Sequence, residues 1–322
     1  MRAITVLIAT GCLLLPMCSP LDGPLPAGSV QATDVKADAL LNQARVYMQN
    51  GKLSKAKSCL DDIVIRHRLA PCAAEARMML AELEMRRGYY REAFDQYSKV
   101  VESYQDSPLY AQALNRQLAM ATAAASGKLT GRVFWLWTVP MEQSVVIKWL
   151  ESVIANAPYG DMAATANSVL GDYLVRRERF DEAAMVYRRL VERYPDSVYA
   201  PAAQMMLANI LASSRNRGNQ NQVYLDRARE AYEEFAYLFP NHADSAKAQA
   251  GVVNMERLLV QQELEVGRYY MERAKEYGSA VFCFENVIRH KAENPSAAAT
   301  AEKLLVQARQ LQAGVKKSSA KR

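Results

Sequence analysis

The sequence predicts an all-α fold, a solenoid (superhelix) of five to six helix–turn–helix units followed by a C-terminal capping helix. Three observations favour this fold class. The 322 residues include only 14 Gly and 12 Pro, apolar residues recur at steps of three and four, and runs of β-branched residues with period two are missing. A single helical hairpin cannot bury its apolar face alone, so its repetition along the chain predicts a stacked array.

The clearest copy of the hairpin is the segment Leu170–Ala203. Within it, Phe180–Tyr194 has an apolar face opposite a charged one, as expected of an amphipathic helix. Asp181 and Glu182 stand in the first turn, where the helix dipole favours negative charge. Pro195 then prevents the helix from continuing.

A residue with a small side chain, near the start of each second helix, defines the repeat. Five helices share one spacing, in which an aromatic residue or Leu is followed by Ala three positions later and by a large residue four positions after that. The alanines are Ala56, Ala93, Ala183, Ala228 and Ala280. A small side chain allows two helices to approach closely where they cross. A degenerate sixth unit fits residues 111–158, with Val146 in place of Ala, and the array as a whole spans residues 37–312.

Two insertions interrupt the array. Ser213–Gln222 is polar and predicts a solvated loop. Ser126–Pro140 differs because Phe134, Trp135 and Trp137 fall within four consecutive positions. We expect these aromatic side chains either to fold back on the repeat surface, the favoured interpretation, or to contact a partner or a membrane.

The C-terminal part has its own pattern. Ser245–Lys275 lacks proline and predicts one long helix or two nearly continuous ones, with Gly251 and Gly267 as weak points. The helix after Pro295 is expected to cap the open end of the array. Residues 313–322 predict a disordered basic tail.

The N-terminus has the features of an export signal. Arg2 precedes an apolar run that ends at Leu15 and is too short to span a bilayer. Residues 1–18 therefore predict the signal, possibly of the lipoprotein type, and residues 19–36 a flexible tether. Cys18 is the preferred candidate for lipidation and Cys12 a weaker one, while cleavage after residue 32 is the alternative.

No constellation of residues predicts catalysis, a metal site or a cofactor, so we expect a protein that is not an enzyme. His67, His242 and His290 have no second ligand or nucleophile at a suitable spacing, and His67 and His290 are expected to meet helix C-terminal carbonyls. The remaining cysteines, Cys59, Cys72 and Cys283, are expected to be free, buried thiols. The net charge of +6 is spread among acids, which argues against nucleic-acid binding.

These spacings resemble the tetratricopeptide repeat, a helix–turn–helix of 34 residues. Leu170-Gly171 stands at the position of the Leu-Gly pair of that repeat, and the units here are slightly longer, because Ala56 and Ala93 are 37 residues apart. The resemblance implies a fold that binds other proteins.

A second resemblance covers residues 37–312 and is most specific in the C-terminal third. Met255–Ile288 is similar to the last repeats of the BamD family of outer-membrane assembly lipoproteins, whose E-L-x-V-A-x-Y-Y pattern is matched by Glu263, Leu264, Val266, Tyr269 and Tyr270, with Gly267 in place of Ala. Tyr194–Ala208 is similar to the Y-P-x-S-x-Y-A-x-x-A signature of the same family.

The BamD resemblance implies a scaffold on the periplasmic face of the outer membrane. Its partners would be the β-barrel insertase complex and unfolded outer-membrane proteins, and only a lipid anchor would attach it to the membrane. Without lipidation the protein would be soluble in the periplasm. The alternatives are a repeat adaptor of another envelope pathway, such as cell-division coordination or polymer export, and a stand-alone peptide-binding chaperone module.

Overall fold

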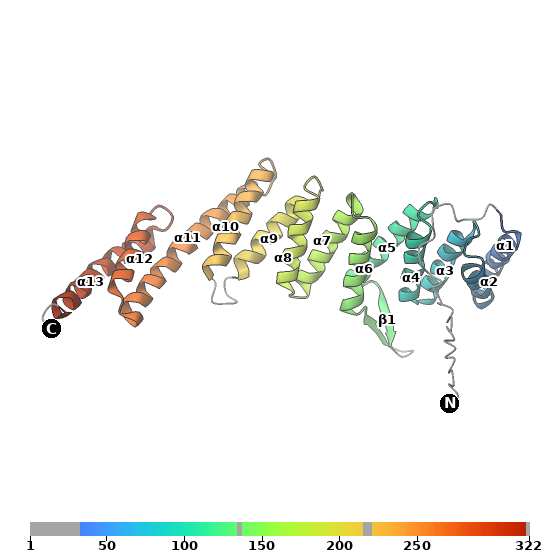
Figure 1. The fold of residues 1–322 in the computed structure, drawn as a ribbon, viewed down its shortest axis with the longest axis horizontal. Helices are drawn as coiled ribbons and strands as arrows, with labels where there is room; N and C mark the ends of the chain where they lie inside the picture. The colour runs from blue at the N-terminus through green and yellow to red at the C-terminus, as the bar shows by residue number, and fades with distance from the viewer. Residues whose placement is uncertain (1–32, 134–136, 215–220, 320–322) are drawn as a thin grey trace, which may run out of the picture. The chain divides into compact units, whose positions relative to one another are not determined.

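The computed structural model describes residues 33–133, 137–214 and 221–319, with backbone only at residues 131–133, 137, 138, 221 and 315–319. It is built from α-helices joined by short turns, with one β-hairpin (Figure 1). The helices and strands are α1 (Val35–Gln49), α2 (Leu53–Arg66), α3 (Ala73–Arg87), α4 (Tyr90–Ser103), α5 (Tyr110–Ala125), β1 (Thr130–Val133), β2 (Trp137–Pro140), α6 (Gln143–Asn156), α7 (Asp161–Arg176), α8 (Phe180–Arg193), α9 (Ala200–Ser214), α10 (Asn221–Leu238), α11 (Ser245–Tyr269), η2 (Tyr270–Ala274), α12 (Tyr277–Arg289) and α13 (Pro295–Ser319).

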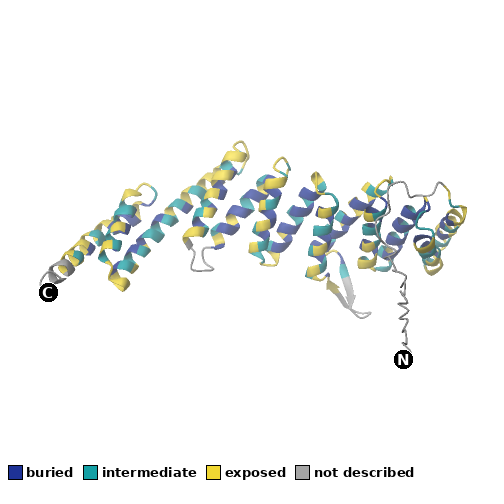
Figure 2. Ribbon diagram, viewed as in Figure 1, coloured by how far each residue is buried: buried dark blue, intermediate teal, exposed yellow. Residues whose placement is uncertain are grey.

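The chain divides into two compact units. Unit 1 contains α1 to α4, most of α5 and the β-hairpin, and unit 2 contains the end of α5 and α6 to α13. Within each unit, successive helices pack as hairpins. Buried residues lie along the packed helices, while exposed residues gather at the turns (Figure 2). The predicted all-α array of helical hairpins is confirmed.

The small residues mark the places where helices touch. Ala56, Ala93, Ala183, Ala228 and Ala280 are all 0% exposed. Gly171 of α7 lies under the ring of Tyr187, and a Cβ there would come within 2.5 Å of Tyr Cε1. A Cβ at Gly251 of α11 would likewise come within 2.8 Å of the Tyr232 ring, and one at Gly267 within 2.7 Å of the Phe284 ring. The two α11 glycines are therefore not weak points, because their missing side chains make room for neighbouring rings.

A residue in the left-handed conformation turns the chain between the two helices of a hairpin. Gly51, Gly88 and Gly127 have φ values of +69°, +80° and +74°. Two other turns place a residue with a side chain in the same conformation, Glu178 and Lys275, both with φ +59°. These two positions carry the strain that glycine avoids.

Tyrosine hydroxyls connect successive helical hairpins. The Tyr104 hydroxyl donates to the Arg68 carbonyl at 2.9 Å, and the Tyr194 hydroxyl donates to the Pro158 carbonyl at 2.7 Å. In both cases the two residues are 36 positions apart. The same hydrogen bond therefore forms once in each compact unit and holds a second helix against the turn before it.

Several boundaries differ from those predicted. Residues 126–140 contain an antiparallel hairpin in which Thr130 pairs with Pro140 and Val133 with Trp137, where we expected a loop. The first helix begins at Val35 because the Asp34 carboxylate caps it by accepting the Ala37 N–H at 3.0 Å. The last helix reaches Ser319 rather than ending at residue 312, since the segment after Pro295 contains no further proline.

Two local expectations also change. His67 places Nδ1 2.7 Å from the Asp34 carboxylate, so its partner is an acid and not a helix carbonyl. Cys59 is half-buried, whereas Cys72 and Cys283 are buried, and all three of these thiols are free.

A candidate partner-binding cleft

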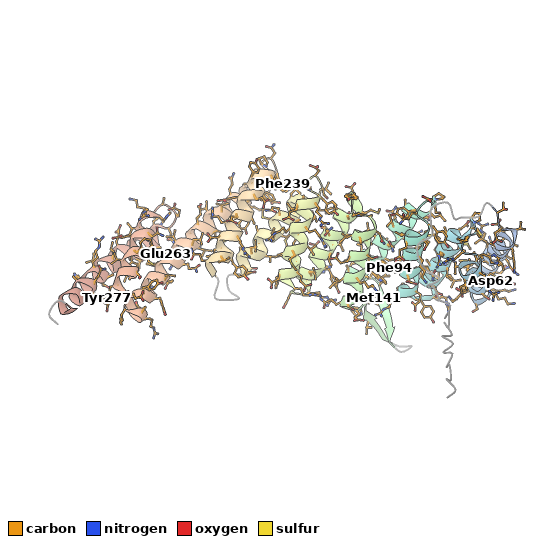
Figure 3. All side chains as sticks on the ribbon, viewed as in Figure 1. Asp62, Phe94, Met141, Phe239, Glu263 and Tyr277 are labelled. Atoms are coloured by element: carbon orange, nitrogen blue, oxygen red, sulfur yellow. The ribbon has the colours of Figure 1, made fainter. Side chains whose placement is uncertain are left out.

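A cleft of about 280 Å³ opens between α10, α11 and α12 of unit 2. Apolar atoms of Leu259, Val260 and Val287 line part of it. The remaining lining residues are polar or charged, and one of them is Glu263 of α11, labelled in Figure 3. Mixed apolar and polar lining of this kind suits a side chain or short segment of another molecule.

The cleft is acidic. Four carboxylates line it, against one arginine and one histidine: Asp226, Glu256, Glu263, Glu293, Arg229 and His290. The Arg229 guanidinium is already paired with Glu233 at 2.6 Å, and the imidazole of His290 lies 3.6 Å from Glu293. With His290 neutral the lining carries a net charge of −3. The cleft therefore favours a cationic group from a partner.

Glu263 also contacts the second helix of its own hairpin. The Cys283 thiol of α12 donates a hydrogen bond to the Glu263 carboxylate, and burial together with this bond raises the pKa of Cys283 to about 12. Cys283 is therefore a thiol at neutral pH.

The other motif residues divide between core and surface. Leu264 is 2% exposed and packs with Phe284 in the C-terminal core, against which Tyr270 also packs. Val266 is half-buried. Tyr269 is 60% exposed, with its ring centroid 6.0 Å from that of Tyr270. Within the motif, Glu263 and Tyr269 are therefore the side chains best placed to meet another molecule.

A π-helical turn ends the long helix and begins at the last residue of this motif. Tyr270 begins η2, and its carbonyl accepts the N–H of Glu276 at 3.0 Å across the turn. The left-handed Lys275 then reverses the chain into α12. Single π-helical turns are frequent at functional sites.

Sequence reasoning missed a series of buried polar residues on the first helices. Each stands four positions before the small residue of its helix, and each is at least 95% buried: Arg77, Gln117, Asn167 and Gln204. Their partners lie on second helices. The hydrogen bonds are Arg77 Nη1 to Gln96 at 3.1 Å, Gln117 to Ser98 at 2.7 Å, Arg189 to Asn167 at 2.7 Å and Gln204 to the Ala231 carbonyl at 2.9 Å.

These bonds restrict how one helix can slide along the next, because a buried polar group that loses its partner costs about 1–3 kcal/mol. Glu263 holds the same place on α11, four residues before Gly267. The signal was available in the sequence as a polar residue at constant distance from Ala or Gly.

Other candidate residues lie outside the described part of the chain. Cys12 and Cys18 precede it, and Phe134 and Trp135 fall in the gap between β1 and β2. Trp137 is described by its backbone alone, which pairs with Val133. Within the described ranges, no group of three or more His, Cys, Asp and Glu side chains is arranged to bind a metal ion. The helices described there are also too short or too polar to cross a membrane.

Helical hairpins stacked in sequence, with a small residue at every crossing, define a repeat solenoid of the class that presents extended surfaces to other proteins. The tetratricopeptide repeat family matches residues 41–108, 150–198 and 168–217. These ranges cover hairpins of both units. The fold is therefore an all-α tetratricopeptide-repeat solenoid, and the protein is a repeat scaffold for protein–protein interaction.

Solved structures of repeat proteins are similar at low identity. The C-terminal part of a repeat-containing protein from Cytophaga hutchinsonii has 14% identity and a TM-score of 0.33, covering 82% of this chain and 87% of that one. A tetratricopeptide repeat protein from Parabacteroides merdae has 13% identity and a TM-score of 0.32, covering 85% and 99%. The P58(IPK) repeat domain has 15% identity and a TM-score of 0.27, covering 89% and 67%.

At these scores the structural likeness carries no argument, and the assignment rests on the matched repeats. No curated protein matches the chain.

The repeat consensus W-x₂-L-G-x₂-Y accounts for part of the C-terminal motif. Val266, Gly267 and Tyr270 occupy its Leu, Gly and Tyr positions. Glu263 occupies the Trp position, and Tyr269 has no counterpart in the consensus. The repeat fold thus explains the packing residues of the motif, and Glu263 shares the polar position four residues before the small residue of its helix. Tyr269 is left without a role in repeat packing.

Proposed function

We propose that the protein is a non-enzymatic scaffold of outer-membrane β-barrel assembly, acting in the periplasm as members of the BamD family do. The observation that carries this proposal is the segment 263–270, which matches the BamD pattern and in which the exposed Tyr269 stands at a position that repeat packing does not require. The predicted export signal and the lipidation candidate Cys18 agree with it. The β-barrel insertase would be the main partner.

The cleft beside Glu263 suggests how the partner is held. Its net charge of −3 would attract a Lys or Arg side chain, and Leu259, Val260 and Val287 would pack against the aliphatic stem of that side chain. The exposed ring of Tyr269 lies on the same helix and offers a further contact of the kind common in interface centres.

Affinity isolation from detergent-solubilised envelopes tests the proposal. We expect the full-length protein to recover the insertase in stoichiometric amount, and Glu263→Lys to reduce that recovery more than tenfold by reversing a charge in the cleft. The matched control is Glu192→Lys, which reverses an exposed charge on α8. Thermal unfolding of both variants establishes that they remain folded.

Consistent absence of the insertase under mild detergent would exclude the proposed role, and recovery of another envelope machine would replace it. The proposed anchor has a separate test, mass spectrometry of the mature N-terminus. A diacyl or triacyl Cys18 is the expected product, and an unmodified chain starting at Thr33 would exclude the anchor.

A further inference from the structure

Cationic side chains gather at two neighbouring turns of unit 1. We call this set the cationic edge. It consists of Lys52 and Lys55 at the start of α2, Arg86 and Arg87 at the end of α3, and Arg91 at the start of α4. All are exposed except Arg87, which is half-buried.

A buried carboxylate holds the two turns together. Glu84 of α3 accepts from Lys57 of α2 at 2.8 Å and from Arg87 at 3.3 Å. The α1–α2 turn and the α3–α4 turn therefore lie side by side within the unit. Their segments, residues 50–57 and 84–92, contain six Lys or Arg and two Glu, which gives the edge a net charge of +4.

Arg86 and Arg87 stand in the last turn of α3, where the helix dipole favours positive charge. Helix stability does not account for the two lysines. Lys52 is the N-cap residue of α2 and Lys55 lies in its first turn, which contains no acidic residue. Positive charge at a helix N-terminus is unfavourable, because the dipole is positive there. The residue before the repeat alanine is Lys55 in this helix, but it is Glu92 in α4 and Glu182 in α8.

The equivalent turn of unit 2 neutralises its own cations. Arg179 forms a two-bond ion pair with Glu182, both hydrogen bonds being 2.6 Å long. Residues 174–182 contain three Arg and three acids and so have no net charge. Among the described residues of unit 1, by contrast, neither Lys52 nor Arg86 has a carboxylate partner.

Aromatic rings accompany the cations. The Arg87 guanidinium lies 4.7 Å from the ring centroid of Tyr89, a residue that is 48% exposed, and the Lys55 ammonium lies 5.9 Å from the ring of Tyr47. Tyrosine beside Lys and Arg is the composition of protein surfaces that rest at the level of lipid headgroups.

We propose that the cationic edge binds the surface of an anionic phospholipid membrane. The argument is charge complementarity, and it rests on the proposed function because an envelope location supplies the membrane. A lipid anchor at Cys18 would raise the effective concentration of the edge at the lipid surface.

Vesicle flotation tests this inference. The chain starting at Thr33 retains every described residue and has no lipid anchor, and it is mixed with vesicles of phosphatidylglycerol and phosphatidylcholine or of phosphatidylcholine alone. The edge variant is Lys52→Gln, Lys55→Gln and Arg86→Gln together. The control variant, Arg188→Gln, Arg193→Gln and Arg227→Gln, removes the same charge from exposed positions of unit 2.

We expect binding to the anionic vesicles alone, weakening as salt shortens the Debye length. Each Lys or Arg near such a surface contributes roughly fivefold, so the edge variant should bind about a hundredfold more weakly and the control variant within about twofold of the parent. Failure of the parent to bind, or equal losses in both variants, would overturn the inference. An edge variant that still binds the anionic vesicles and loses only a protein partner would also overturn the inference.

These outcomes are independent of insertase recovery. Vesicle binding without the insertase would contradict the proposed function and leave the edge intact. Recovery of the insertase without vesicle binding would support the proposed function and contradict membrane binding by the edge.

Discussion

Replacing Gly171 by Val tests the close approach of α7 and α8. The Cβ of any side chain at Gly171 would lie 2.5 Å from Cε1 of Tyr187, whereas carbon atoms in contact are about 3.5–4.0 Å apart. The ring has no free space because Tyr187 is 1% exposed, and its hydroxyl donates to Asp172 at 2.7 Å. The ring must therefore move by about 1 Å against a filled core and strain that hydrogen bond.

The expected cost follows from three effects. Overpacking costs about 1–3 kcal/mol, a weakened hydrogen bond adds about 1 kcal/mol, and the better helix propensity of Val over Gly returns about 0.5 kcal/mol. The net destabilisation is about 1.5–3.5 kcal/mol. For a unit of this size it lowers the thermal midpoint by roughly 3–14 °C.

Calorimetry or circular dichroism of the full chain measures this change. Gly314→Val on α13 is the matched control, since a Cβ there meets nothing within 4 Å. In a Tyr187→Leu background, the cost of Gly171→Val should fall below about 1 kcal/mol because the ring is gone. Equal effects at Gly171 and Gly314 would refute the described crossing.

Three further predictions concern a turn, a cap and the thiols. Glu178→Gly should stabilise the protein by about 0.5–1 kcal/mol in urea unfolding, because φ +59° suits glycine; a loss of stability would contradict the strain. Hydrogen bonds from the Ala37 N–H and then from His67 lower the pKa of Asp34 below 3.8 in the folded protein. The stabilisation by its charge is therefore present above pH 3.8 and lost as the pH falls through the folded-state pKa. Asp34→Asn should flatten the acidic side of a plot of unfolding free energy against pH, and an unchanged plot would count against the cap. Iodoacetamide at pH 8 should label the half-buried Cys59 before Cys283, whose buried thiol has a pKa of about 12, and mass spectrometry showing the reverse order would contradict the described burial.

Much of the fold followed from spacing along one helix face. The burial of Ala183 and Tyr187 could be predicted because both residues lie on the apolar face of one amphipathic helix. Gly267 was not, since a helix propensity scale counts glycine only as a breaker. Its role depends on Phe284, which reaches it from another helix after a π-helical turn.

The hairpin at Thr130–Pro140 was missed for a different reason. Each strand has four residues, too few for a period of two to stand out. Short strands depend on the partner strand more than on their own composition.

The candidate cleft could be predicted only in part. Glu263 was identified from its sequence motif, but the carboxylates beside it come from α10, α11 and the turn after α12. Their convergence depends on how three helices pack, which a linear pattern does not contain. The cationic edge was missed similarly, because Lys55 and Arg86 belong to different repeats and unite only when the two turns lie side by side.

Site-specific photo-cross-linking at Tyr269 in intact cells tests whether the protein binds the β-barrel insertase. This exposed side chain belongs to the motif that supports the proposed role, and Tyr237, exposed on α10, provides a control position. We predict that a cross-linker at Tyr269 captures the β-barrel insertase in good yield, whereas one at Tyr237 captures little of it. Cross-links from Tyr269 to a different envelope machine, with none to the insertase, would contradict the account.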